Sequence, residues 1–186
     1  FLENNKFTEL NCVALEDDSA SVKAEGSFQL SGTPSESGVL YLWIGGKSVS
    51  VAVSTSSTPD AVVAALAFAV NGDDSLPVDA SVNGSDTTVL DIVAKNAGEF
   101  GNDIIIKHSH SRGQKLPDGL TATVTEMSGG AGNPDVSQVW SVIGDEQFIL
   151  MSTPYLDSTN LSAVETELAD RFGPIKQNDG YAIYAK

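Results

Sequence analysis

The spacing of hydrophobic residues changes once along this chain, and that change limits the folds that it can adopt. From about Val22 to Glu126, short runs alternate between apolar and polar residues and are separated by Gly, Ser, Asn, Asp and Pro, a pattern typical of β-strands joined by turns. Beyond Ser128–Pro134 the spacing becomes that of α-helices. We therefore expect a β-rich region, then a region of helices and strands, with Ser128–Pro134 as a hinge-like linker.

The clearest element of the β-rich region is a hairpin. Its predicted strands, Val39–Ile44 and Lys47–Ser54, flank Gly45-Gly46, and two glycines supply the positive φ angles of a tight two-residue turn. The pattern predicts further strands at Val78–Val82, Thr88–Ala94, Asp103–Ser109 and Leu120–Glu126.

A single helix interrupts these strands. Thr58 is a suitable cap, Pro59 suits the first helical position, Asp60 favours the positive helix end, and Asn71-Gly72 ends the helix. Because Ala61–Val70 is almost free of polar residues, we expect this helix to be covered on most sides. The region as a whole predicts a small β-sandwich or barrel-like domain with one helix packed on it.

The last part of the chain predicts a βαβ unit after a short helix at Val136–Ile143. Gln147–Ser152 and Tyr181–Ala185 are the strands, and Asp157–Phe172 is the helix between them. Ser162 and Glu165 have the spacing of a capping box. One apolar helical stripe is expected to hold Leu161, Val164, Leu168 and Phe172. A βαβ unit normally belongs to a parallel sheet covered by helices.

The start of the chain predicts the tail of a helix at Phe1–Asn5 and an apolar strand at Glu9–Leu15, in which Cys12 is expected to be buried. Glu9–Leu15 has no local partner, and one βαβ unit cannot bury both faces of its strands. We therefore expect this strand to pair with Gln147–Ser152. The predicted organisation is a discontinuous, partial α/β domain of residues 1–21 and 134–186, interrupted by an inserted β-sandwich domain of residues 22–133.

Composition excludes several classes of function. The chain has 25 acidic residues against 10 Lys plus Arg, a formal net charge of −15, and no basic stripe, so it should repel nucleic acid. One cysteine allows no intrachain disulfide, and no apolar run reaches the roughly 20 residues of a membrane helix. The chain opens without Met and without a signal peptide, which predicts a piece of a longer protein.

The sequence offers no constellation of catalytic residues. His108 and His110, expected on one face of a strand, are the only histidines, and no Gly-x-Ser-x-Gly elbow accompanies them. As a metal site the pair lacks further ligands, Asp103 being a weak third candidate. Asp17-Asp18 and Asp73-Asp74 match no calcium loop and are expected to be solvated turn acids, and Gly129–Gly132 lacks the ending of a phosphate loop. We expect no enzyme and no catalytic, cofactor-binding or metal-binding residue.

Five segments together resemble one protein family. Ala94–Ile104 (AKNAGEFGNDI) resembles the AKxxGxxGNDI signature of Mu-type phage tail sheath proteins. Leu116–Pro134 is similar to the LPxGLTxTVTxMxGGAGxP segment that follows there, and Val39–Gly46 resembles the family's GxLYLxIxG hairpin strand. Asp145–Tyr155 and Arg171–Tyr181 match its DEQ…TPY and RFGPxxQxDG stretches.

This resemblance implies a fold and a role. It implies a β-sandwich domain inserted into an α/β domain that is similar to subtilisin but has no protease triad. It implies a structural subunit that polymerises with other sheath subunits around a tail tube and, on a signal from the baseplate, contracts and drives the tube through the host envelope. The location implied is the virion tail, after assembly in the host cytoplasm. Terminal extensions that link neighbouring subunits are absent here, so we expect this chain alone to be a monomer or a weak oligomer.

Two other classes stay open on the sequence. A β-sandwich adhesion or carbohydrate-binding module needs an exposed aromatic platform, for which Trp43 with Tyr41 is the candidate. A hydrolase with a subtilisin-like core needs Asp, His and Ser within reach of one another, and two histidines two residues apart argue against it.

Overall fold

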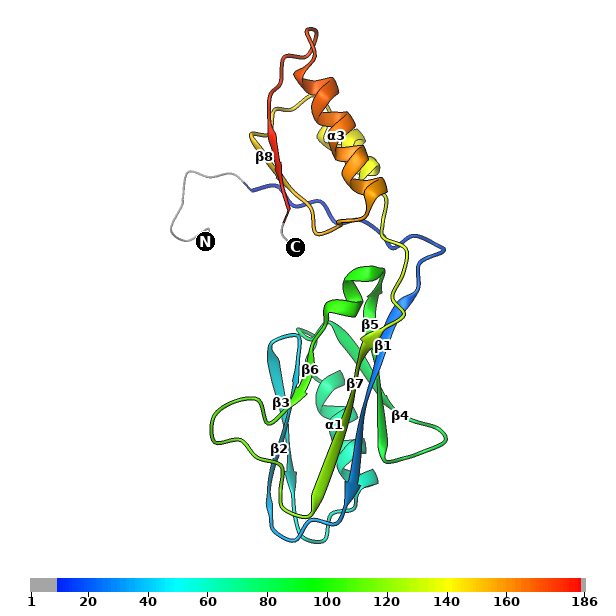
Figure 1. Ribbon diagram of the computed structural model, residues 1–186, viewed down its shortest axis with the longest axis vertical. Coiled ribbons are helices and arrows are strands. Elements are labelled where there is room, and N and C mark those ends of the chain that lie inside the picture. Colours follow the sequence, from blue (N-terminus) through cyan, green and yellow to red (C-terminus); the bar gives the residue numbers. More distant parts are fainter. Residues whose placement is uncertain (1–9, 185–186) are drawn as a thin grey trace. The chain divides into compact units, whose positions relative to one another are not determined.

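The computed structural model describes residues 10–184, in which the chain divides into two compact units. The larger unit is Asp17–Asn133, and the smaller unit combines the described residues up to Glu16 with the chain from Pro134 onward. The described residues form a mixed α/β fold with three sheets and three α-helices (Figure 1).

Two antiparallel sheets form most of the larger unit. The four-stranded sheet has the order β4 (Val78–Val82), β5 (Val89–Ala97), β1 (Lys23–Gly32) and β7 (Leu120–Ser128). The three-stranded sheet has the order β3 (Lys47–Val53), β2 (Gly38–Ile44) and β6 (Ile106–His108). Helix α1 (Pro59–Asn71) packs against β3 and β4, which are edge strands of the two sheets, and β6 lies against β7 (Figure 1).

One apolar core joins both sheets and the helix. Phe28 of β1, Leu42 of β2 and Leu66 of α1 are fully buried within it. Burying a side chain of this size contributes about 1.5–3 kcal/mol, which makes the packing of the sheets on α1 the main source of stability of this unit.

The hairpin is confirmed. β2 and β3 pair from Gly38 opposite Val53 to Ile44 opposite Lys47, and Gly45 and Gly46 have φ angles of 57° and 85°. The bounds of α1 are confirmed as well, because the helix runs from Pro59 to Asn71. The expectation that α1 is covered on most sides is wrong. Phe68 is 83% exposed, because the two sheets cover only the inner side of the helix.

Two further predictions for this region need correction, and one strand was not predicted. The ten-residue strand β1 lies at the centre of the larger sheet and was not predicted. The predicted strand Asp103–Ser109 is shortened to Ile106–His108, because Glu99–Asp103 forms the 3-10 turn η1 and Ser109 has a φ of 49°. Ser128–Pro134 is not a free hinge: β7 continues to Ser128, and Ala131 pairs with Val22.

The smaller unit contains the predicted βαβ arrangement. After η2 (Val136–Val139) and α2 (Trp140–Ile143), β8 (Leu150–Ser152) runs parallel to β9 (Tyr181–Ile183), with α3 (Ser158–Phe172) between them in sequence.

The start of α3 differs from the predicted capping box. Asp157 is the cap, and its carboxylate accepts a hydrogen bond from the Asn160 N–H at 2.9 Å. Ser162 lies inside the helix, where its carbonyl accepts from the Thr166 hydroxyl. The predicted stripe is wrong at Phe172, which is 74% exposed, because the neighbouring Arg171 takes the buried position.

The predicted strand Glu9–Leu15 is wrong for its described residues. Leu10–Leu15 forms no strand, and β8 pairs with β9 alone among residues 10–184. The apolar side chains of this segment instead line a cavity in the smaller unit, and Cys12 is exposed. Phe1–Asn5, Glu9 and Ala185 lie outside the described residues.

Candidate functional site

The signature segment Ala94–Ile104 folds against Gly130–Asn133, and we call this junction (residues 97–102 and 130–133) the neck of the larger unit. The Asn102 side chain donates to the Gly130 carbonyl at 2.9 Å and accepts from the Gly130 N–H at 2.8 Å. The Asn133 side-chain oxygen accepts from the Glu99 N–H at 3.0 Å. These bonds satisfy backbone groups that turns would otherwise leave unpaired.

The glycines of the neck are required by close packing. A Cβ on Gly101 would lie 2.8 Å from the Cβ of Ala24, and a Cβ on Gly130 would lie 2.5 Å from the Gly98 carbonyl oxygen. Gly98 itself has a φ of 115°, which side chains rarely allow. The signature residues therefore have a structural role in holding turns together.

The neck also joins the two ends of the larger unit. The Ala97 N–H donates to the Asp17 carboxylate at 2.8 Å, and the Gly98 N–H donates to the Val22 carbonyl at 3.0 Å. Val22 and Ala131 exchange backbone hydrogen bonds of 2.8 and 3.1 Å. The chain thus begins and ends this unit at one place.

In the smaller unit, the other two family-like stretches meet at a buried arginine. Arg171 is 2% exposed, and its guanidinium donates to the Glu167 carboxylate (2.8 Å) and to the carbonyls of Glu146 (2.7 Å) and Gly144 (2.6 Å). The Asn178 side chain donates to the Asp145 carbonyl at 2.9 Å. Charged hydrogen bonds of this kind are stronger than neutral ones, so Arg171 fixes the turn after α2 onto α3.

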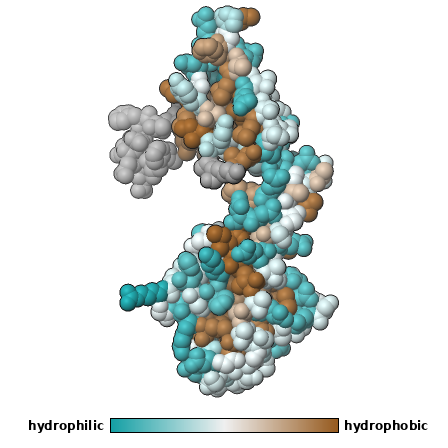
Figure 2. All heavy atoms as spheres, viewed as in Figure 1, coloured by the Kyte–Doolittle hydropathy of each residue, from teal (hydrophilic) through white to brown (hydrophobic). Residues whose placement is uncertain are grey.

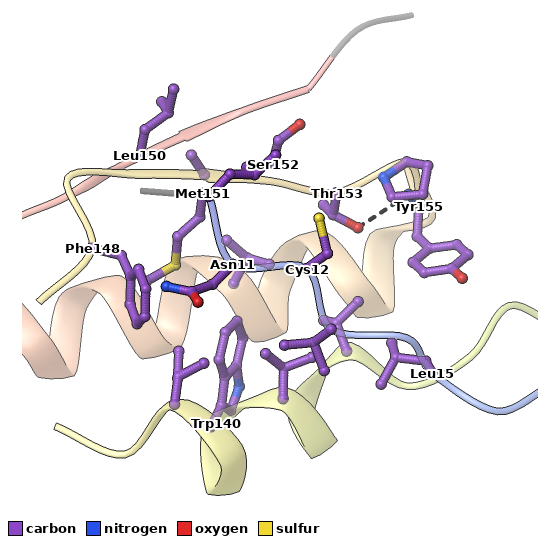
Figure 3. Close-up of a pocket in the computed structure, with 18 residues that line it drawn as sticks. Asn11, Cys12, Leu15, Trp140, Phe148, Leu150, Met151, Ser152, Thr153 and Tyr155 are labelled. Atoms are coloured by element: carbon purple, nitrogen blue, oxygen red, sulfur yellow. Dashed lines mark hydrogen bonds between the residues drawn. The ribbon is translucent and has the colours of Figure 1, made fainter. Parts of the chain in front are cut away.

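A cavity of about 480 Å³ lies between Leu10–Leu15, the helices and β8 (Figure 3). Trp140 and Phe148 lie along it, with Met151 beside Phe148 (Figure 3). None of the 18 lining residues carries a charged side chain. The cavity can therefore accommodate apolar groups, and its lining within residues 10–184 includes no carboxylate, lysine or histidine of the kind that acid–base chemistry uses.

The sheet of the smaller unit is covered on one face. Met151 and Ala182 line the cavity and are half-buried, and Leu150 at its edge is 58% exposed. Tyr181 and Ile183 of β9 do not line the cavity and are 70% and 57% exposed. In Figure 2, hydrophobic side chains reach the surface of this unit. Parallel strands are normally buried on both faces, so this apolar face is suited to a further layer of protein.

The two histidines do not share a face. Ser109, with its positive φ, ends β6, and the His108 ring contacts the buried Phe28 ring edge-on, at 6.3 Å between centroids. The His110 ring contacts Trp43 on the outer face, at 5.7 Å. The prediction of two imidazoles side by side is wrong, and no cluster of three or more metal-ligating side chains occurs among residues 10–184.

Three of the four paired acids accept hydrogen bonds from backbone N–H groups. The carboxylates of Asp17 and Asp18 accept from the backbone N–H groups of Ala97 and Ala20. The Asp73 carboxylate accepts from the Ser75 hydroxyl and N–H, which keeps the pKa of Asp73 below its ordinary value. The contacts of Asp18 and Asp73 are those of turn-forming residues, whereas Asp17 binds a backbone N–H that is 80 positions away in the sequence.

The aromatic candidate platform is partly covered. Trp43 and Tyr41 are half-buried on β2, the Trp43 indole N–H donates to the Gln114 side chain at 2.9 Å, and the His110 ring lies edge-on to Trp43. The loop between β6 and β7 therefore occupies part of the surface that a sugar ring would need.

No protein-family model matches the chain. Over all 186 residues, the sequence is 33% identical to the Mu-like prophage FluMu tail sheath protein of Haemophilus influenzae (strain ATCC 51907 / DSM 11121 / KW20 / Rd). The predicted resemblance to Mu-type tail sheath proteins is confirmed. The chain spans 38% of the length of this sheath relative.

Solved structures give weaker similarities. The flagellar cap protein FliD of Escherichia coli (domains D1-D2-D3) has a TM-score of 0.33 at 11% identity, covering 64% of this chain and 42% of that chain. The D2-D3 domains of FliD from Serratia marcescens have a TM-score of 0.28 at 15% identity, covering 67% and 85%. TM-scores this low do not show that the chain shares the fold or the role of these proteins. Within residues 10–184, no helix combines the length and the apolar character needed to cross a membrane.

Proposed function

We propose that this chain is part of the structural subunit of a contractile tail sheath, which polymerises around the tail tube and contracts to drive it through the host envelope. The observation that carries the proposal is the 33% identity to a tail sheath protein in an alignment that covers all 186 residues of the chain. The subunit's partners would be other sheath subunits, the tail tube and baseplate proteins, in the virion tail, after assembly in the host cytoplasm. No enzymatic activity is part of this role.

The proposed domain organisation is a partial α/β core of residues 1–21 and 134–186 carrying an inserted β-sandwich of residues 22–133. The neck supports an insertion, because Val22 and Ala131 pair where the larger unit begins and ends. For the α/β core we propose the subtilisin-like, non-catalytic fold of the sheath family. The exposed Leu150, Tyr181 and Ile183 would then be covered by further chain, since the relative is longer than this sequence.

An exchange experiment tests the role. The matching segment of the Haemophilus influenzae relative is replaced by this 186-residue chain, and the chimera is viewed by negative-stain electron microscopy. Tubes of stacked rings, as expected of the unmodified relative, support the proposal. A soluble, folded chimera without rings or tubes contradicts it. A chimera with Phe28→Asp, which places a charge in the core, is the matched misfolding control.

The alternative is an adhesion or carbohydrate-binding module built on the β-sandwich. The partial cover of Trp43 by His110 and Gln114 weighs against it. Binding to a glycan array that is lost on Trp43→Ala, and retained on Trp140→Ala, would favour this alternative.

A further inference from the structure

The larger unit contains two Asn-Gly pairs, Asn71-Gly72 and Asn83-Gly84. An asparagine before a glycine is chemically labile, because the backbone nitrogen of the glycine can attack the side-chain amide and no Cβ hinders its approach. Both pairs reach solvent: Asn71, Gly72 and Gly84 are exposed, and Asn83 is half-buried. Exposure therefore does not distinguish the two pairs, but their hydrogen bonds do.

At Asn71-Gly72, the groups that would react are all hydrogen-bonded. The Asn71 side chain donates to the Ala80 carbonyl at 2.7 Å and accepts from the Ala80 N–H at 2.9 Å. The Gly72 N–H, which would supply the attacking nitrogen, donates to the Phe68 carbonyl at 3.0 Å at the end of α1. Because reaction at Asn71 requires these bonds to break first, the end of α1 protects this pair.

At Asn83-Gly84, in the loop between β4 and β5, the attacking nitrogen is unbound. The Gly84 N–H donates no hydrogen bond to any group within residues 10–184. A Cβ built on Gly84 would meet no atom within 4 Å, so the space beside this residue is open. The backbone therefore has room to bring the Gly84 nitrogen against the Asn83 side chain.

The side-chain amide of Asn83 is polarised by the same loop. Its oxygen accepts from the Ser85 N–H at 2.9 Å and from the Asp86 N–H at 3.1 Å. Two N–H donors on one carbonyl oxygen stabilise the negative charge that develops there when a nucleophile attacks the carbon. The amide nitrogen donates to the Asp91 carboxylate at 2.8 Å, which fixes the orientation of the amide.

We propose that Asn83 is a site of spontaneous deamidation in the folded chain, whereas Asn71 is protected. The Gly84 nitrogen loses its proton to water or hydroxide and bonds to Cγ of Asn83, the Cγ–Nδ2 bond breaks, and Nδ2 takes a proton from water and leaves as ammonia. Water then opens the resulting cyclic imide at either of its carbonyls. One opening gives aspartate and the other gives isoaspartate, in which the backbone passes through the former side chain. Water is the only co-reactant, and the inference does not depend on the sheath role.

The products would change the contacts of the loop. A carboxylate at position 83 no longer donates to Asp91 and places a second negative charge within hydrogen-bond distance of the Asp91 carboxylate. Isoaspartate also lengthens the backbone, which disturbs the hydrogen bond of 2.9 Å from the Asn83 N–H to the Val89 carbonyl that closes the loop. Deamidation should therefore weaken the pairing of β4 with β5.

Peptide mapping by mass spectrometry tests the site on the 186-residue chain. The folded protein is incubated at mildly alkaline pH in water enriched in heavy oxygen, so that each opened imide gains the label. The rate at Asn83 should exceed the rate at Asn71 by about tenfold or more, because Asn71 and Gly72 must first lose their hydrogen bonds. In denaturant this protection is lost, and the two rates should become similar.

Gly84→Ala is the matched variant. The added methyl group hinders attack by the backbone nitrogen but meets no other atom within 4 Å, so the fold should be unchanged and the rate at Asn83 should fall to a small fraction of the parent rate. Equal rates at Asn71 and Asn83 in the folded chain would overturn the proposal. A rate at Asn83 that rises about tenfold or more on unfolding would also overturn it, because the fold would then protect both pairs. A rate that Gly84→Ala leaves unchanged would rule out the attack by the Gly84 nitrogen.

Asn83→Asp reproduces the aspartate product and tests its effect on the loop. Unfolding is followed by Trp43 fluorescence in a Trp140→Phe background, which reports the larger unit. Asn83→Asp should lower the midpoint of this transition, and the loss should be smaller when it is measured in an Asp91→Asn chain, because the pair of like charges is then absent. An equal loss with and without Asp91→Asn would contradict the repulsion between positions 83 and 91.

Discussion

The two units of this chain differ in what they bury. In Asp17–Asn133, side chains from both sheets and α1 form one apolar core that includes Phe28, Leu42 and Leu66. In the smaller unit, the buried residues among those described are Pro134, Val136, Val164, Asn160 and Arg171. The larger unit therefore has the hydrophobic burial of an independent domain, whereas the smaller one depends on buried hydrogen bonds and leaves an apolar sheet face open.

The two tryptophans allow this comparison to be measured. Trp43 belongs to the larger unit and Trp140 to the smaller one. Fluorescence during denaturant unfolding therefore reports one unit in a Trp140→Phe background and the other in a Trp43→Phe background. We expect the transition reported by Trp140 to occur at the lower denaturant concentration. Coincident transitions would show that the units unfold together.

The largest effect is expected from the core of the larger unit. Phe28→Ala should lower the unfolding free energy reported by Trp43 by about 3–5 kcal/mol, because it removes a fully buried ring and leaves a cavity. The Trp140 transition should not move. Phe68→Ala is the matched control, and because Phe68 is exposed its effect should stay within about 0.5 kcal/mol. Equal losses from the two variants would contradict the proposed core.

A smaller loss is expected from the polar centre of the other unit. Arg171→Ala should lower the stability reported by Trp140 by about 2–3 kcal/mol, because the carbonyls of Gly144 and Glu146 lose their donor. Lys176→Ala removes an exposed ion pair with Asp170 and should shift this transition much less, because solvent screens the pair. A comparable shift from both variants would argue against a special role for the buried arginine.

The hydrogen bonds of the neck should contribute less to stability than the core around Phe28 or the hydrogen bonds of Arg171. Asn102→Ala should cost about 1–2 kcal/mol in the transition reported by Trp43, because both backbone groups of Gly130 lose their side-chain partner. Exposed Asn96 on β5 is the control, as Asn96→Ala. Hydrogen exchange of the Gly130 and Ala131 amides should accelerate in the Asn102 variant alone. Unchanged exchange would show that the neck is held by the Val22 pairing without Asn102.

The smallest effect is expected from an exposed turn. The hydrogen bonds from Thr88 lower the pKa of Asp86 in the folded unit. Ionised Asp86 therefore stabilises the folded unit fully above the unfolded-state pKa of about 4. This stabilisation is lost as the pH falls through the lower pKa of the folded state. The Trp43 midpoint should therefore depend less on pH in Asp86→Asn than in the parent chain. Glu126→Gln, also exposed, is the control. An identical pH dependence in Asp86→Asn and the parent chain would show that Asp86 does not contribute to the pH dependence of stability.

The local signals of the sequence were sufficient for several elements. Gly45-Gly46 fixed the hairpin, and Pro59 with Asn71-Gly72 fixed the bounds of α1, because turn glycines and helix ends depend on residues close in sequence. The parallel pairing of β8 with β9 followed from the order of strand, helix and strand. Glu9–Leu15 was different. An apolar run suits both a strand and the lining of a cavity, and only its distant neighbours decide between them.

For the candidate site, too, some features could be predicted from the sequence and others depended on the tertiary structure. The sequence by itself determined the resemblance to Mu-type sheath proteins, because ordered short motifs are read directly from the residues. What those motif residues do was decided by the tertiary structure: Asn102 reaches Gly130, and Arg171 reaches Gly144, across 28 and 27 positions of sequence. The local pattern also predicted that the side chains of His108 and His110 share one face of a strand. In the structure, the positive φ of Ser109 ends the strand, and the two rings contact different partners. Propensity and capping act between near neighbours, whereas burial and hydrogen-bond partners depend on which distant segments the fold brings together.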